Sequence, residues 1–147
     1  MPTSDTPSAP LPCAFAKAVL ARQGGCPLVT MALVGEAEQP RCASPVANTN
    51  CRTLQALVRE RATFALRLPP PATPLAHATE IRLQCGGLRG LAAALGEPDA
   101  APADIHALVT RARDTFGGLL GIPFDQVVAG VVRWEGRARA AGGGERP

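Results

Sequence analysis

The sequence predicts an all-α fold, a single small irregular bundle of about five to six helices, from three observations. Apolar residues recur at helical spacing along almost the whole chain, and no stretch shows the clean alternation of a half-buried strand. The 147 residues are enough for one domain with a modest core. With four Phe, one Trp and no Tyr, that core has to consist of small aliphatic side chains, which suits close helix contacts.

The helical, cysteine-bearing domain is expected to span residues 12–140. Residues 1–11 and 141–147 are rich in Pro, Gly or Ser, and such segments bury too little apolar surface to become ordered. We therefore expect disordered tails at both ends. The chain has no repeat of fixed period and no linker that would indicate a second domain.

The first predicted helix runs from about Cys13 to Gln23 and ends at Gly24-Gly25, because glycine tolerates the left-handed dihedrals of a helix end. A second, short helix is predicted within "CPLVTMALVGEAE", residues 26–38. Pro27 would occupy its first turn, where a missing N–H does no harm.

The next predicted helix starts after Ser44, whose hydroxyl can accept a backbone N–H, and continues to about Leu66. Pro45 follows Ser44 at the first helical position. "LRLPPPATP", residues 66–74, is then an extended connector stiffened by proline. Thr73 and Pro74 repeat the helix-start pattern, and the helix that they open reaches Cys85.

Three further helices complete the prediction. A brief one covers "LRGLAAAL", residues 88–95, after the expected break at Gly86-Gly87. The last two, Asp104 to Phe116 and Phe124 to about Ala140, show apolar residues at helical spacing. We expect them to form an antiparallel hairpin that packs on the cysteine-bearing part.

Five cysteines are the chemically distinctive residues, and 12, 15, 8 and 33 residues separate them in turn. Three lie at expected helix boundaries, in "GGCP", "PRCASP" and "QCGG". The fourth, Cys51, would point inward two turns into the helix that starts after Ser44. The predicted ligand set for a metal centre is therefore Cys26, Cys42, Cys51 and Cys85, with Cys13 as a spare or a substitute for one of the four.

An iron–sulfur cluster suits this setting. Helix N-termini and glycine turns supply backbone N–H groups that stabilise thiolates and bridging sulfides. Glycine also allows the main chain to approach a bulky cluster without a Cβ in the way. We therefore expect a [4Fe-4S] cluster as the cofactor. Zinc is the weaker alternative, since structural zinc sites usually place two ligands in one tight knuckle, which this chain lacks.

The sequence gives little support for an enzyme. A nucleophilic thiol at Cys26 would need a base, and His77 and His106 are better explained as surface or capping residues. No "GxxxxGK[ST]" loop is present, and "CGGLRGL" follows a helix rather than a strand. The uncoordinated alternative is that each cysteine is a small buried thiol, structural or sensitive to oxidation.

Composition narrows the partners and the compartment. One Lys and otherwise Arg make up the 15 basic residues, and a net charge of +3 with interspersed acids forms no basic face for nucleic acid. No window of eighteen apolar residues predicts a membrane span, and the N-terminal sequence does not resemble a signal peptide. A cytoplasmic location, which keeps thiols reduced, is therefore expected.

The functional hypothesis is a small iron–sulfur protein that transfers electrons to a protein redox partner or within a larger complex. The competing hypothesis is a non-enzymatic interaction or regulatory module. In that case the cysteines would be structural, redox-sensing or zinc-binding, and the last helical hairpin with Trp134 would dock on a partner.

Overall fold

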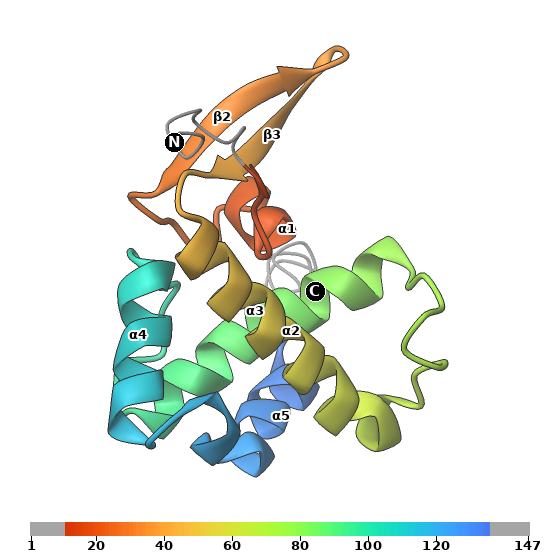
Figure 1. Ribbon diagram of the computed structural model, residues 1–147. Coiled ribbons are helices and arrows are strands. Elements are labelled where there is room, and N and C mark those ends of the chain that lie inside the picture. The colour runs from red at the N-terminus through yellow and green to blue at the C-terminus, as the bar shows by residue number, and fades with distance from the viewer. Residues whose placement is uncertain (1–10, 136–147) are drawn as a thin grey trace, which may run out of the picture.

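The computed structural model describes residues 11–135 and contains a three-stranded antiparallel sheet beside five α-helices (Figure 1). The prediction of an all-α fold is therefore wrong. Of the predicted tails, residues 1–10 and 141–147 lie outside the described residues, whereas Leu11, predicted as the end of the first tail, belongs to a strand. The elements are β1 (Leu11–Pro12), α1 (Ala16–Leu20), β2 (Val29–Val34), β3 (Ala37–Cys42), α2 (Pro45–Leu66), α3 (His77–Ala94), α4 (Ile105–Thr115), the 3-10 turn η2 (Leu119–Gly121) and α5 (Phe124–Arg133).

The sheet takes the place of the predicted short helix within residues 26–38. β2 and β3 form a hairpin, and β1 pairs with the other edge of β3, so that the order is β1-β3-β2. Two features favour strands here. Val29, Thr30 and Val34 are β-branched, which suits the pleated conformation. Gly35 has a φ of +67°, and such a positive φ closes the tight turn between the strands.

The start signal predicted at Ser44-Pro45 is confirmed, whereas the one predicted at Thr73-Pro74 is wrong, because α3 begins only at His77. The hydroxyl oxygen of Ser44 accepts a hydrogen bond from the N–H of Ala47 at 3.1 Å, and Pro45 is the first residue of α2. Asp104 caps α4 in the same way, because its Oδ1 accepts from the N–H of Ala107 at 2.9 Å. These caps satisfy backbone donors that a helix start leaves free. The prediction for α1 is too long, since only Ala16–Leu20 is helical.

α3 is one continuous helix, and the break predicted at Gly86-Gly87 does not occur. These glycines serve the packing of α3 on α5. A Cβ added at Gly86 would lie 2.6 Å from the Cα of Val131, and one at Gly90 would lie 2.5 Å from the carbonyl oxygen of Val127. The absence of a Cβ thus allows the two backbones to approach closely, as in the "small-residue" contacts of helix pairs.

The helical body surrounds one aliphatic core. α3 runs through its centre, with α2, α4 and α5 packed around it (Figure 1). α5 packs chiefly against α3. The prediction of a last helix from Phe124 to about Ala140 is too long, because α5 ends at Arg133 and Trp134 is extended; residues 136–140 lie outside the described part. In residues 11–135 no helix is both long enough and apolar enough to cross a membrane. The most deeply buried large side chains of the core include Leu88, Leu91, Ile105, Val127 and Val131.

Alanine substitutions in α3 test the close helix contact. Gly90→Ala should lower the free energy of unfolding by about 1–3 kcal/mol, because its methyl group would collide with the α5 backbone. Gly87→Ala is the matched control in the same helix, since its Cβ would meet Val58 at an ordinary 3.5 Å. The control should be neutral or stabilising by up to about 1 kcal/mol, the helix-propensity gain. Urea denaturation measures both, and equal effects would contradict this account of the contact.

Candidate functional site

The junction between β3 and α2 carries two of the five cysteines. Cys42 is the last residue of β3 and is 8% exposed, and Cys51 lies two turns into α2. Ser44, the cap of α2, stands between them in the chain. The thiol of Cys42 donates a hydrogen bond to the carbonyl oxygen of Ser44 at 3.4 Å, which holds this sulfur near the start of the helix.

The sheet brings two more cysteines to Cys42, one from each side. On one side Leu11 pairs with Cys42, and the N–H of Cys13 donates to the carbonyl of Pro40 at 3.1 Å. On the other side Val29 pairs with Cys42, and the N–H of Val29 donates to the carbonyl of Cys26 at 3.1 Å. Cys13 and Cys26 therefore flank the end of β3 at which Cys42 lies.

One face of α2 completes this arrangement. Asn48 Nδ2 donates to the carbonyl of Pro12 at 2.8 Å, and Gln55 Nε2 donates to the carbonyl of Ala14 at 3.4 Å. Cys51 lies between Asn48 and Gln55 at helical spacing, so its turn of α2 lies opposite Cys13. Asn48 is only 2% exposed, and its Oδ1 has no hydrogen-bond partner within the described part of the chain.

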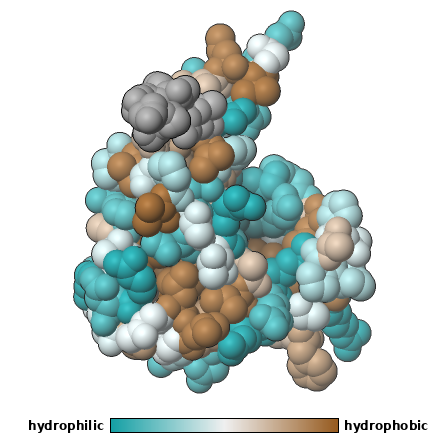
Figure 2. All heavy atoms as spheres, in the orientation of Figure 1, coloured by the Kyte–Doolittle hydropathy of each residue, from teal (hydrophilic) through white to brown (hydrophobic). Residues whose placement is uncertain are grey.

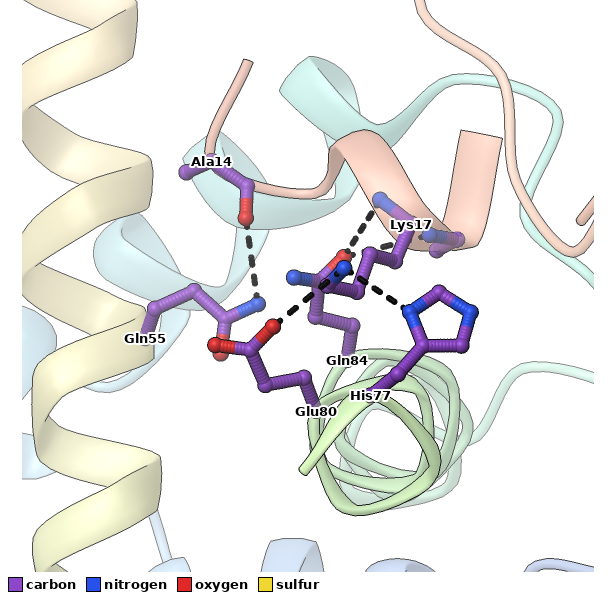
Figure 3. Close-up of polar contacts among 7 residues, drawn as sticks. Ala14, Lys17, Gln55, His77, Glu80 and Gln84 are labelled. Atoms are coloured by element: carbon purple, nitrogen blue, oxygen red, sulfur yellow. Dashed lines mark hydrogen bonds and ion pairs between the residues drawn. The ribbon is translucent and has the colours of Figure 1, made fainter. Parts of the chain in front are cut away.

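Polar contacts from α3 hold α1, which follows the segment that carries Cys13 (Figure 3). Gln84 Oε1 accepts hydrogen bonds from the N–H groups of Lys17 and Ala18, at 2.9 and 3.1 Å. Lys17 Nζ also lies 3.3 Å from the carboxylate of Glu80 and 2.9 Å from Nδ1 of His77. The short helix α1 is thus fixed to α3, and its preceding residues are fixed to α2.

The thiols influence one another electrostatically. Burial, as the largest cause, and the nearby thiols of Cys13, Cys26 and Cys42 together raise the pKa of Cys51 to about 12. The pKa of Cys13 is raised by burial and by Cys26 and Cys42, against a backbone hydrogen bond at Phe15 that lowers it. Because neighbouring thiolates repel one another, these couplings place Cys13, Cys26, Cys42 and Cys51 in one electrostatic group.

Cys85 lies apart from this group. It is a 1% exposed residue of the hydrophobic core in α3. Burial raises the pKa of its thiol to about 11, and the charge of Arg89 partly opposes that rise. The pKa values of Cys13 and Cys51 depend on the other thiols of the group and not on Cys85.

The structure thus brings together three of the four predicted ligands, Cys26, Cys42 and Cys51, and adds Cys13, the predicted substitute. We call Cys13, Cys26, Cys42 and Cys51 the thiol group. Among the residues that the structure describes, no three Cys, His, Asp or Glu side chains are arranged to hold a metal ion as they stand. Gly35 was the signal in the sequence that could have predicted this grouping. A hairpin that turns at Gly35 places Cys26 and Cys42 at the same end of its two strands.

Replacing Gln84 tests the attachment of α1. Gln84→Met should leave two α1 N–H groups without their acceptor and destabilise the fold by about 1–2 kcal/mol. It should also increase the rate at which Cys13 is alkylated, because the segment before α1 becomes freer to open. The matched control is Gln126→Met on the exposed surface of α5. Alkylation followed by mass spectrometry measures the rate, and identical rates in both variants would refute this role of Gln84.

The raised thiol pKa values predict how stability depends on pH in the metal-free protein. Between pH 9 and about 12, an unfolded chain releases thiol protons that folded Cys51 and Cys85 retain. The folded state therefore binds more protons, and the free energy of unfolding should fall as pH rises through this range. Cys51→Ser should make the fall shallower in denaturation curves recorded at several pH values. An unchanged slope in this variant would contradict the prediction.

Comparison with known protein families, characterised proteins and solved structures finds no match for this chain. The functional conclusion below therefore depends on the geometry and chemistry of the thiol group.

Proposed function

We propose that the thiol group binds one iron–sulfur cluster, a [4Fe-4S] cluster in the first instance, and that the protein transfers electrons. The observation that carries this proposal is the convergence of four cysteines from four separate segments on the end of β3 next to α2. Four thiolates are the usual ligands of such a cluster. In this proposal Cys13 is the fourth ligand, in place of Cys85, which the sequence predicted.

The chemistry of the thiols supports a metal centre. Buried, mutually repelling thiols hold their protons in the absence of a cation, as the pKa of about 12 for Cys51 illustrates. Bound iron reverses this balance, because a coordinating thiol loses its proton outright and its negative charge is compensated. Binding also requires the four sulfur atoms to move closer together, since within residues 11–135 no three ligating side chains are placed to hold a metal ion.

A cluster fits this group better than a single zinc ion. Ligand spacings of 12, 15 and 8 residues give no two cysteines in one compact knuckle, the usual feature of structural zinc sites. The N-terminus of α2 contributes a positive helix-dipole end beside Cys42, which stabilises the negative charge of a thiolate-bound cluster.

The surroundings suit a small electron carrier. Cys13, Cys26 and Cys51 are only partly buried, so an edge of a bound cluster would lie near the surface, where a protein redox partner or a larger complex can approach. The proposal includes a cytoplasmic location, where the thiols stay reduced until iron and sulfide are supplied.

Anaerobic reconstitution tests the proposal. The protein, incubated with iron, sulfide and a thiol reductant, should acquire broad visible absorbance and about four iron and four sulfide ions per chain. Serine substitution at Cys13, Cys26, Cys42 or Cys51 should each reduce the bound iron by more than about half, because a ligand is lost. Cys85→Ala is the matched control, a buried cysteine outside the thiol group, and should retain the full iron and sulfide content.

Two results would contradict the proposal. Failure of the wild-type chain to hold iron and sulfide would exclude a cluster, and tight binding of one zinc ion instead would assign the thiol group to a structural role.

Loss of the cluster in Cys85→Ala, with retention in Cys13→Ser, would mean that Cys85 rather than Cys13 is the fourth ligand. An EPR signal on reduction, absent from Cys51→Ser, would identify the cluster as redox-active.

A further inference from the structure

We propose that the outer edge of β2 is a dimerisation surface, on which β2 of a second copy of this chain pairs antiparallel to form a continuous six-stranded sheet. The proposal concerns the β2–β3 hairpin, which projects beyond the helical body in Figure 1. It depends on the backbone and side chains of β2 and goes beyond the proposed cluster.

The hydrogen-bonding direction of each β2 residue follows from the pairing with β3. The carbonyl of Leu28 accepts from the N–H of Ala43, so even-numbered residues direct their backbone groups toward β3. The odd-numbered residues direct theirs to the opposite side, since this direction alternates along a strand. Because β2 is the last strand in the order β1-β3-β2, the N–H and C=O groups of Met31 and Leu33 lie on a sheet edge that no other strand within residues 11–135 pairs with.

The side chains of β2 do nothing to protect this edge. Proteins usually block exposed edges with charged residues, proline or a bulge, because an open edge recruits further strands. β2 has the sequence VTMALV, without a charge or a proline, whereas its neighbour β3 contains Glu38, Pro40 and Arg41. Met31, Leu33 and Val34 are 45%, 73% and 46% exposed. Figure 2 shows hydrophobic residues on the projecting hairpin.

The symmetry of strand pairing indicates a second copy as the occupant. A two-fold axis perpendicular to the sheet leaves corresponding side chains of the two copies on the same face of the joined sheet. Since side chains alternate between faces along a strand, an odd-numbered residue must lie opposite an odd-numbered one, and an even-numbered residue opposite an even-numbered one. Centring the axis on Ala32 places Met31 of each copy opposite Leu33 of the other. These are the two residues with free backbone groups, and each such pair exchanges two hydrogen bonds.

Charge and shape agree with this occupant. When the uncharged strand β2 pairs with its own copy, no unpaired charge is buried and no like charges lie opposite each other. A charged strand from another protein would bury its charges against this apolar edge without partners. Because the hairpin projects from the body, two copies can align their β2 edges with the helical bodies kept apart (Figure 1).

Sedimentation velocity over micromolar to submillimolar concentrations tests the proposal on the full chain. The wild type should be a dimer, and Leu33→Lys should raise the dissociation constant about a hundredfold or more, since two lysines would enter an apolar edge. Phe64→Lys is the matched control, because Phe64 is 94% exposed on α2, far along the chain from β2, and should leave the dimer intact. Circular dichroism verifies that both variants keep their helices.

A wild type that stays monomeric throughout this range would overturn the proposal, as would a Leu33→Lys variant that still dimerises like the wild type. Cys51→Ser separates this test from that of the cluster. Cys51 contributes nothing to the β2 edge, so this variant should dimerise even though it loses the cluster. A dimer that depends on Cys51 but not on Leu33 would assign association to the metal centre and refute pairing through β2.

Discussion

A hydrogen bond from Asn48 Nδ2 of α2 to the carbonyl of Pro12 in β1 ties the sheet to the helical body. Asn48 is the one buried polar residue in the described core, and it lies one turn of α2 before Cys51. Loss of such a bond leaves a carbonyl and an amide without partners, at a cost of about 1–3 kcal/mol for each buried group. The position of Cys13 opposite Cys51 depends on this link, and so does the shape of the thiol group.

The helices could be predicted where the signal is local. Ser44 with Pro45 and the cap at Asp104 each act within one turn, so the starts of α2 and α4 follow from a few residues. The strands could not be recognised by alternation, because β2 is apolar or small at nearly every position and shows no polar face. The continuity of α3 through Gly86 depends on the backbone of α5, a tertiary contact that no local pattern contains.

The candidate site, like the fold, could be predicted only where the signal is local. Cys42 and Cys51 could be associated from the sequence because both belong to the start of one helix. Choosing between Cys13 and Cys85 required the topology, since β1 returns to β3 through pairing with Cys42, while α3 carries Cys85 into the core. "QCGG" resembles a turn beside a metal centre, but its glycines serve the contact with α5. A helix contact and a cluster-binding turn both favour glycine, which is why local sequence could not separate them.

The whole thiol group comes from residues 13–51, with intervening loops of 12, 15 and 8 residues. Closing loops this short costs little chain entropy, and each closes rapidly. The residues that carry these four thiols are therefore all synthesised before α3, whereas the contacts that fix the flanking segments, from Gln84 to α1 and from Pro102 and Ile105 to Gly25, come from later parts of the chain. In the proposed cluster-binding form, all four ligands would thus belong to the first 51 residues, and the helices that follow would close over a site whose ligands are already made.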